Sequence, residues 1–249
     1  MRQFNYFLLI LFATIFTMGA NQSLIGQSKW SLHPGGDFVS RYIWRGTDFG
    51  NSPAIQPSLE FGYSGFALGA WGSYSTNDAN FQEADLYLSY TFKEIVTLTV
   101  TDYFFPDGRI ENNDYLNYDS DSTRHVLEGM ISFNGTEKIP LSLIIATNFA
   151  GADAKTADGK LQYSTYIELG YSTHLGETSV DIFLGGTPNN PDKDKGESGY
   201  YGPKAGIVNF GITGGRDIQI SEKFALPIQV SLITNPVQKN VFFVFGISL

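Results

Sequence analysis

The chain has 249 residues, with 15% aromatic residues, 27 glycines, a net charge of −9 and no cysteine. The lack of cysteine excludes a disulfide framework, a thiolate zinc site and a cysteine nucleophile, and the acidic balance argues against nucleic acid as a partner. The mean hydropathy of −0.10 is that of a water-soluble chain, which conflicts with the large aromatic content. The spacing of the residues along the chain must therefore place apolar and polar side chains on different surfaces.

Residues 1–27 are predicted to be a signal peptide. One positive charge at Arg2 precedes an apolar run from Phe7 to Met18, and small and polar residues follow. The run is shorter than the about 20 apolar residues that a membrane-spanning helix needs. An uncleaved anchor helix is the alternative. We expect cleavage between residues 20 and 27, so that residues 28–249 form an exported domain.

Strict alternation of apolar and polar residues dominates the chain beyond residue 30. In residues 53–63, for example, Ile55 and Phe61 share one face, while Gln56 and Glu60 share the other. Such alternation predicts β-strands with two different faces. Twelve strands are predicted, at residues 37–46, 53–63, 65–75, 81–93, 95–105, 123–133, 139–149, 161–172, 178–186, 204–215, 223–234 and 240–249.

The predicted connections alternate in length. Short returns are expected at residues 64–65, 93–94, 134–138, 172–177 and 216–223. Connections on the opposite side include much longer loops, at residues 107–122, 151–160 and 187–203. Short periplasmic turns and long extracellular loops are typical of outer-membrane barrels. The sequence therefore predicts an all-β fold, a single transmembrane antiparallel up-and-down β-barrel of about 12 strands in the outer membrane of a Gram-negative bacterium. A secreted β-sandwich or lipocalin-like barrel is the alternative.

A barrel in lipid must pair all of its backbone groups internally, turn its apolar face outward and line its interior with the polar face. Aromatic residues near the strand ends are then expected to form girdles at the membrane surfaces. The residues assigned to these girdles are Tyr42, Trp44, Phe61, Tyr63, Tyr90, Phe92, Tyr103, Phe104 and Phe105.

Several stretches resemble a bacterial family of exported proteins, Gcw_chp, also labelled TorF-type porins. The similarity is carried by residues 40–46, which read Ser-Arg-Tyr-Ile-Trp-Arg-Gly, and by residues 53–57, 69–73, 83–90 and 245–249. It extends over residues 37–249. The resemblance implies an outer-membrane barrel that acts as a pore, and it supplies no catalytic residues.

Polar residues on the presumed inner faces are the candidates for lining a pore. They are Arg41, Arg45, Gln56, Glu60, Glu83, Asp85, Arg124, Glu128, Gln162, Glu168, Asp181 and Asn209. An acidic excess in a lumen would favour cations or neutral polar solutes. The alternative is structural: Arg41 and Arg45 would pair with Glu60, Glu83 or Asp85 on neighbouring strands, because unpaired charges in a confined lumen are costly.

A lipid hydrolase is a remote alternative. His33 is expected before the first strand and His174 in a periplasmic turn, which leaves His125, near the outer end of a strand and level with Asp102. A hydrolase would also need a serine beside His125, and Ser120 or Ser122 would have to fold back from the loop. We expect no enzyme activity, with His125 as an interfacial polar residue.

The long outer loops are acidic but match no calcium-binding pattern, so neither a metal nor a cofactor is expected. The expected partners are outer-membrane lipid, lipopolysaccharide, the barrel-assembly machinery and small polar solutes. The sequence thus predicts a porin for passive diffusion of small polar solutes or ions. A closed structural or adhesive barrel is the alternative.

Overall fold

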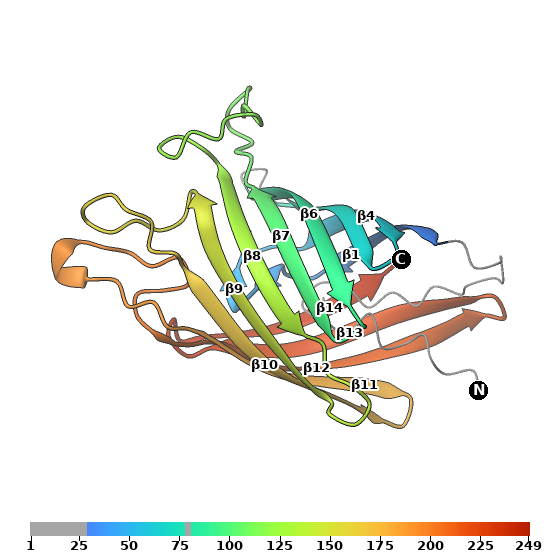
Figure 1. Ribbon diagram of the computed structural model, residues 1–249. Helices are drawn as coiled ribbons and strands as arrows, with labels where there is room; N and C mark the ends of the chain where they lie inside the picture. The colour runs from blue at the N-terminus through green and yellow to red at the C-terminus, as the bar shows by residue number, and fades with distance from the viewer. Residues whose placement is uncertain (1–28, 78–80) are drawn as a thin grey trace.

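The computed structural model describes residues 29–77 and 81–249, so the predicted signal peptide lies outside the described residues. Twelve strands form a closed antiparallel barrel in the order β1, β14, β13, β12, β11, β10, β9, β8, β7, β6, β5, β4 (Figure 1). Their bounds are β1 Trp30–Val39, β4 Ala54–Tyr63, β5 Phe66–Ser75, β6 Gln82–Phe92, β7 Val96–Phe104, β8 His125–Phe133, β9 Leu141–Gly151, β10 Thr165–Leu175, β11 Thr178–Thr187, β12 Gly206–Ser221, β13 Phe224–Asn235 and β14 Asn240–Ser248. The predicted fold class and strand number are confirmed.

Every strand of the barrel pairs with its sequence neighbours, and the first strand closes on the last. β1 pairs with β4 along its whole length, from Trp30 opposite Tyr63 to Val39 opposite Ala54. Its pairing with β14 covers Asp37, Phe38 and Val39, which lie opposite residues 248, 247 and 246, and backbone hydrogen bonds extend it only to Gly36 with Leu249 and Ser40 with Phe245. The closing seam of the barrel is therefore much shorter than the other strand pairs.

The two ends of the barrel differ, as the sequence predicts. One end carries tight turns, such as Ser64–Gly65, whose φ angles of 49° and 88° suit a two-residue hairpin turn. The other end carries the long connections 105–124, 152–164 and 188–205, the last of which contains the short 3-10 helix η2, Lys193–Lys195. Figure 1 shows these connections gathered at the opposite end from the C-terminus. We call the two ends the turn end and the loop end.

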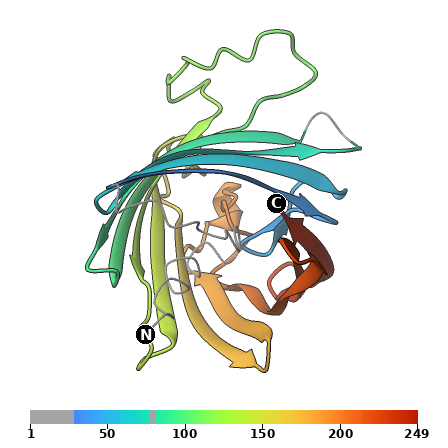
Figure 2. The same ribbon diagram turned by 90° about the vertical axis from the view of Figure 1, so that its right-hand side faces the viewer.

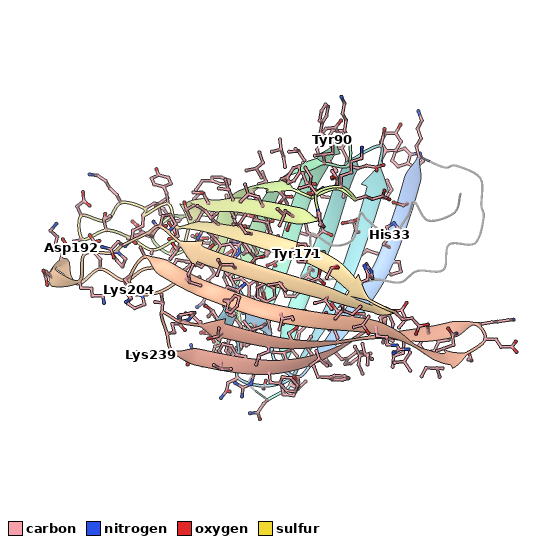
Figure 3. All side chains as sticks on the ribbon, turned by 90° about the horizontal axis from the view of Figure 1, so that it is seen from below. His33, Tyr90, Tyr171, Asp192, Lys204 and Lys239 are labelled. Carbon is pink, nitrogen blue, oxygen red and sulfur yellow. The ribbon has the colours of Figure 1, made fainter. Side chains whose placement is uncertain are left out.

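The outer surface of the barrel is apolar. Leucine, isoleucine, valine and phenylalanine side chains alternate along the strands and are exposed, including Leu59, Leu88, Leu98, Leu169 and Phe243. Figure 3 shows side chains standing out from the strands, with Tyr171 among the strands and Asp192, Lys204 and Lys239 at the loop end. No helix among the described residues is long and apolar enough to cross a membrane.

The predicted boundaries of three strands were wrong. β1 spans Trp30–Val39 rather than residues 37–46, which places His33 within the strand. β12 continues to Ser221, so the return predicted at residues 216–223 is reduced to residues 222–223. His174 lies within β10 rather than in a turn. The patterns misled because Pro34, Gly35 and Gly36 in β1 and Gly214 and Gly215 in β12 suggest turns, although cross-strand pairing holds them extended.

The aromatic girdle prediction holds for only part of its members. Phe61, Tyr90 and Phe92 are exposed on the outer surface at the turn end, where Trp30 also stacks on Tyr63 with ring centroids 3.9 Å apart. Tyr42, Trp44 and Tyr103 are instead buried in an interior aromatic cluster, against which Phe105 packs. Phe104 is buried beneath Tyr115 of the loop that follows it. Periodicity alone could not distinguish the exposed rings from the buried ones, because an aromatic residue at a strand end can lie on either the outer or the inner face.

Candidate functional site

The segment between β1 and β4, residues 40–53, enters the barrel instead of extending the first strand. We call it the inserted segment; within it, β2 (Ile43–Trp44) and β3 (Thr47–Asp48) form a separate two-stranded hairpin. Figure 2 shows this part of the chain inside the ring of strands. Arg45 and Gly46 form its turn with φ angles of 48° and 77°, and this left-handed pair matches a type I′ turn.

Gly46 brings the tip of the hairpin against the barrel wall at β12 and β13. A Cβ atom on Gly46 would lie 1.8 Å from the backbone oxygen of Val208 in β12, so only glycine fits here. The Asn235 side chain, at the end of β13, donates a hydrogen bond of 3.1 Å to the carbonyl oxygen of Gly46. The hairpin therefore spans the interior and is held by strands far away in the sequence.

Arg45 is the most highly connected charged residue of the interior. It is 7% exposed and donates both of its terminal nitrogens to Glu128 of β8, with an Nη2–Oε1 distance of 2.9 Å. It also donates a 2.6 Å hydrogen bond to the Tyr201 hydroxyl. Tyr103 donates to the Glu128 carboxylate at 3.0 Å, so several groups share this charge pair.

Aromatic rings enclose the Arg45 guanidinium. Its carbon lies 4.4 Å from the ring centroid of Trp44 and 4.6 Å from that of Tyr166, which are cation–π distances. A second group of apolar contacts holds the hairpin: Ile43 packs with Phe183, Ile233, Phe242 and Val244 on the inward faces of β11, β13 and β14. The loop half of the interior is thus filled by the inserted segment and its neighbours.

The turn half of the interior has a different lining. Small hydroxyl side chains alternate along its inward faces, and several bond to one another across strands: Thr91 to Thr97 at 3.0 Å and Thr213 to Ser231 at 2.8 Å. The other members of this set are Ser89, Thr99, Ser132, Ser142, Ser172 and Ser179. The interior therefore changes from aromatic and ion-paired at the loop end to small and hydroxylated at the turn end.

The family model of Gcw_chp, described as a bacterial protein of unknown function, matches residues 26–208. The chain belongs to the Gcw_chp family. This match confirms the resemblance to the Gcw_chp family. The matched range, 26–208, begins 11 residues before and ends 41 residues before the range of the resemblance, 37–249.

Solved structures similar to this Gcw_chp protein are outer-membrane channels of low identity. A mutant Rh. blastica porin is 11% identical with a TM-score of 0.38, and the match covers 79% of this chain and 55% of that porin. OmpF of Salmonella typhi in complex with daunomycin is 10% identical with a TM-score of 0.38, covering 87% and 96%. An outer membrane channel from Pseudomonas putida F1 is 12% identical with a TM-score of 0.34, covering 93% and 98%. A comparison with curated proteins found no match.

Most of the predicted lining residues of this Gcw_chp protein lie on inward faces of the strands. Gln56 donates to Ser73 at 3.2 Å, Glu60 accepts from Tyr87 at 2.8 Å, and Asp181 accepts from Ser172 at 2.6 Å. Asn209 donates to the Tyr166 hydroxyl and to Glu168, both at 2.9 Å. Glu83, Asp85 and Glu128 are buried on inward faces.

Four predicted lining residues, Arg41, Arg45, Arg124 and Gln162, lie outside the barrel strands, and the predicted pairings of Arg41 and Arg45 were both wrong. Arg41 belongs to the inserted segment and pairs with Asp48 at 2.7 Å. Arg124 precedes β8, and Gln162 precedes β10, where it donates to backbone oxygens of Lys155 and Ser198. Arg45 pairs with Glu128 rather than with Glu60, Glu83 or Asp85, because the hairpin carries it away from the neighbouring strands.

Sequence reasoning missed the groups that hold Arg45, namely Tyr103, Tyr166 and Tyr201. Tyr201 lies in the connection 188–205, 156 positions from its partner Arg45, so no local spacing could reveal the contact. One signal of the hairpin was present in the sequence. Arg45–Gly46 lies between the apolar pair Ile43–Trp44 and the polar pair Thr47–Asp48, and such a dipeptide can form a type I′ turn. Such a turn would have divided the predicted strand 37–46.

His125 and Asp102 of this Gcw_chp protein meet on the outer face of β7 and β8. His125 Nδ1 lies 2.6 Å from Asp102 Oδ1, and Nε2 lies 2.7 Å from the backbone oxygen of Tyr115. The ring of Tyr118 stacks on His125 at 4.2 Å. The position that a catalytic serine would need at Nε2 is thus held by a backbone carbonyl, while the Ser122 hydroxyl accepts from Asn117.

These contacts predict that His125 anchors the loop 105–124. In a His125→Ala variant we expect the loop to become more susceptible to protease and its amides to exchange faster, while the barrel stays intact. Native proteolysis and hydrogen exchange of the refolded protein measure this. A His33→Ala variant serves as the control, since His33 lies at the other end of the barrel (Figure 3). Lipid hydrolysis that the His125→Ala change abolished would contradict the anchoring role.

Within residues 29–77 and 81–249, no group of three or more histidine, aspartate or glutamate side chains is arranged to hold a metal ion. Several acids of the connections at the loop end are instead paired with lysines. Asp192 bonds with Lys195 at 2.9 Å, and Lys155 joins two loops by donating to Asp121 at 2.8 Å. Hydrogen bonds from the neighbouring lysines lower the pKa of Asp192 and of Asp121.

Proposed function

We propose that this protein is a narrow passive channel for small polar solutes or ions in the outer membrane of a Gram-negative bacterium, with the inserted segment as its constriction. The observation that supports it is the two-part interior. The hydroxyl-lined turn half offers hydrogen bonds to a hydrated solute, and the hairpin with its Arg45–Glu128 pair narrows the loop half.

The outer surface supports the membrane location. Exposed apolar side chains cover the strands, and exposed Trp30, Phe61, Tyr90 and Phe92 lie toward the turn end. Such a surface is stable in hydrocarbon, and aromatic rings favour the membrane–water boundary. We propose that the turn end faces the periplasm, that lipid and lipopolysaccharide surround the barrel, and that the barrel-assembly machinery inserts it.

The charges of the interior support a preference for cations over anions. Inward faces carry Glu60, Glu83, Asp85, Glu168 and Asp181, whereas the charge of Arg45 is balanced by Glu128. A carboxylate lowers the energy of a passing cation by about 1 kcal/mol at about 4 Å in water. The passing solute need not be charged, but anions are disfavoured.

Planar-bilayer recording of the refolded protein tests the proposal. We expect discrete conductance steps with a cation preference, and Glu60→Gln is expected to lower the cation-to-anion permeability ratio by up to about fivefold. Glu177→Gln is the matched control, because that side chain is 80% exposed in a turn. A silent bilayer from protein that keeps heat-modifiable gel migration would overturn the channel and favour a closed structural or adhesive barrel.

A further inference from the structure

A pocket of about 240 Å³ lies at the loop end, between the inserted segment and the connection 105–124. Four aromatic rings contribute to its walls, those of Tyr42, Phe49, Phe81 and Phe105. Glu83 of β6 lines it, as do Asp107, Arg109 and Arg124 from the connection between β7 and β8. The pocket therefore combines an apolar wall with charged groups of both signs.

Among residues 29–77 and 81–249, no basic side chain pairs with the carboxyl group of Glu83, which lines this pocket, or with that of Asp85 on the same strand. The two side chains share the inward face of β6 and are 4% and 6% exposed. Glu83 Oε2 and Asp85 Oδ1 accept no hydrogen bond, and the Glu83 carboxyl group is otherwise hydrogen-bonded only to Tyr42 and to Asp85. Two adjacent buried carboxylates without a basic partner are costly, so this site favours a positively charged group.

The rim of the pocket carries positive charge, in contrast to the carboxyl groups of Glu83 and Asp85. Asp107 is bonded by Arg109 through its Nε at 2.8 Å and its Nη2 at 2.7 Å, and the Arg124 guanidinium approaches the same carboxylate only to 3.8 Å. Hydrogen bonds from Arg109 hold the pKa of Asp107 well below its usual range, so that carboxylate stays ionised. Two guanidinium groups around one carboxylate leave an excess positive charge at the rim.

The walls select between classes of positively charged ligand. Aromatic faces attract organic ammonium groups, and they offer no oxygen ligands to a metal ion. In the described part of the chain the two carboxylates are not joined by a third acidic or histidine ligand. An ammonium group at Glu83 and Asp85 therefore fits the site better than a metal ion does.

We propose that this pocket binds a small zwitterion with an apolar body, of the amino-acid or dipeptide class. The ammonium group contacts Glu83, whose carboxyl group adjoins that of Asp85, the apolar body lies against the rings of Tyr42, Phe49 and Phe105, and the carboxylate faces Arg124. Binding itself needs only the folded barrel. The step from binding to passage rests on the proposed channel.

Isothermal titration calorimetry on the refolded protein in detergent micelles tests the site with three matched probes. L-leucine carries both charges, isopentylammonium lacks the carboxylate, and 4-methylpentanoate lacks the ammonium group. We expect saturable leucine binding and weaker binding of each analogue by about tenfold or more, since each loses one charge-assisted contact. Equal binding of leucine and isopentylammonium would overturn the zwitterion assignment.

Three variants separate the two ends of the pocket. Glu83→Gln is expected to abolish binding of leucine and isopentylammonium, and Arg124→Gln to remove the preference for leucine over isopentylammonium. Asp192→Asn, in the same end of the barrel but outside the pocket, is expected to bind as the unchanged protein does. Heat-modifiable gel migration verifies that each variant is folded.

The outcomes also separate the pocket from the channel. A protein that conducts in bilayers but shows no saturable binding of any probe would overturn the pocket and leave the channel standing. A protein that binds leucine but is silent in bilayers would support the pocket and overturn the channel. Binding of 4-methylpentanoate as tightly as leucine would overturn the role of Glu83.

Discussion

An Arg45→Ala variant is expected to be less stable by about 3–5 kcal/mol, because it leaves the Glu128 carboxylate buried without its partner. Glu128 is 1% exposed and receives both terminal nitrogens of Arg45 in the native protein. The loss also removes the cation–π contacts with Trp44 and Tyr166. Urea-induced unfolding in lipid vesicles, followed by tryptophan fluorescence, measures the change. If the hairpin is displaced in molecules that remain folded, the conductance rises severalfold.

Arg41→Ala is the matched control for Arg45→Ala. Both residues lie in the inserted segment and pair with a carboxylate, but the Arg41 side chain is 38% exposed, so its loss is expected to cost less than about 1 kcal/mol. Combining Arg45→Gln with Glu128→Gln gives a double-mutant cycle, in which strong coupling between the two changes is expected. Equal losses for Arg41→Ala and Arg45→Ala would contradict the central role of the Arg45–Glu128 pair.

Gly46→Ala is expected to expel the tip of the hairpin from the interior while the barrel itself remains folded. The added Cβ would lie 1.8 Å from the Val208 carbonyl oxygen, and a backbone atom of a central strand cannot move away. A conformation at positive φ adds strain of about 1 kcal/mol for alanine. The expected result is a severalfold higher conductance together with unchanged heat-modifiable migration.

Gly159→Ala separates the clash from the strain. Gly159 also has a positive φ, of 81°, but an added Cβ would meet nothing within 4 Å. The control therefore carries the backbone strain without the contact, and its conductance is expected to match that of the native protein. If both alanine variants conduct alike, the close approach of Gly46 to β12 does not hold the constriction.

The barrel was predictable from sequence because its signal is local and repeated. Alternation within each strand, such as that of Gln56 and Glu60 with Ile55 and Phe61, marks which face is polar, and the twelve repeats with their unequal connections identify the closure. The inward positions of Gln56, Glu60, Glu168, Asp181 and Asn209 followed from the same rule.

The constriction was not predictable in the same way. Tyr42, Ile43 and Trp44 have the composition of a strand, and no local pattern says whether an extended segment joins the sheet or enters the barrel. The decision depends on contacts with Glu128, Val208 and Asn235, which lie more than 80 positions away. Gln162 was misplaced for a related reason, because the polar connection before β10 continues the alternation of the strand.

The position of the inserted segment directly after β1 constrains how the protein can be assembled. Its tip is held by β8, β12 and β13, while β1 itself is joined to the last strand only along its final residues, from Gly36 to Ser40. A preformed cylinder would offer this tethered hairpin no route to the interior except through the crowded loop end. The wall is therefore expected to wrap around the hairpin as the later strands are added. In this order of events the inserted segment is a folding nucleus, and the seam between β1 and β14 closes last.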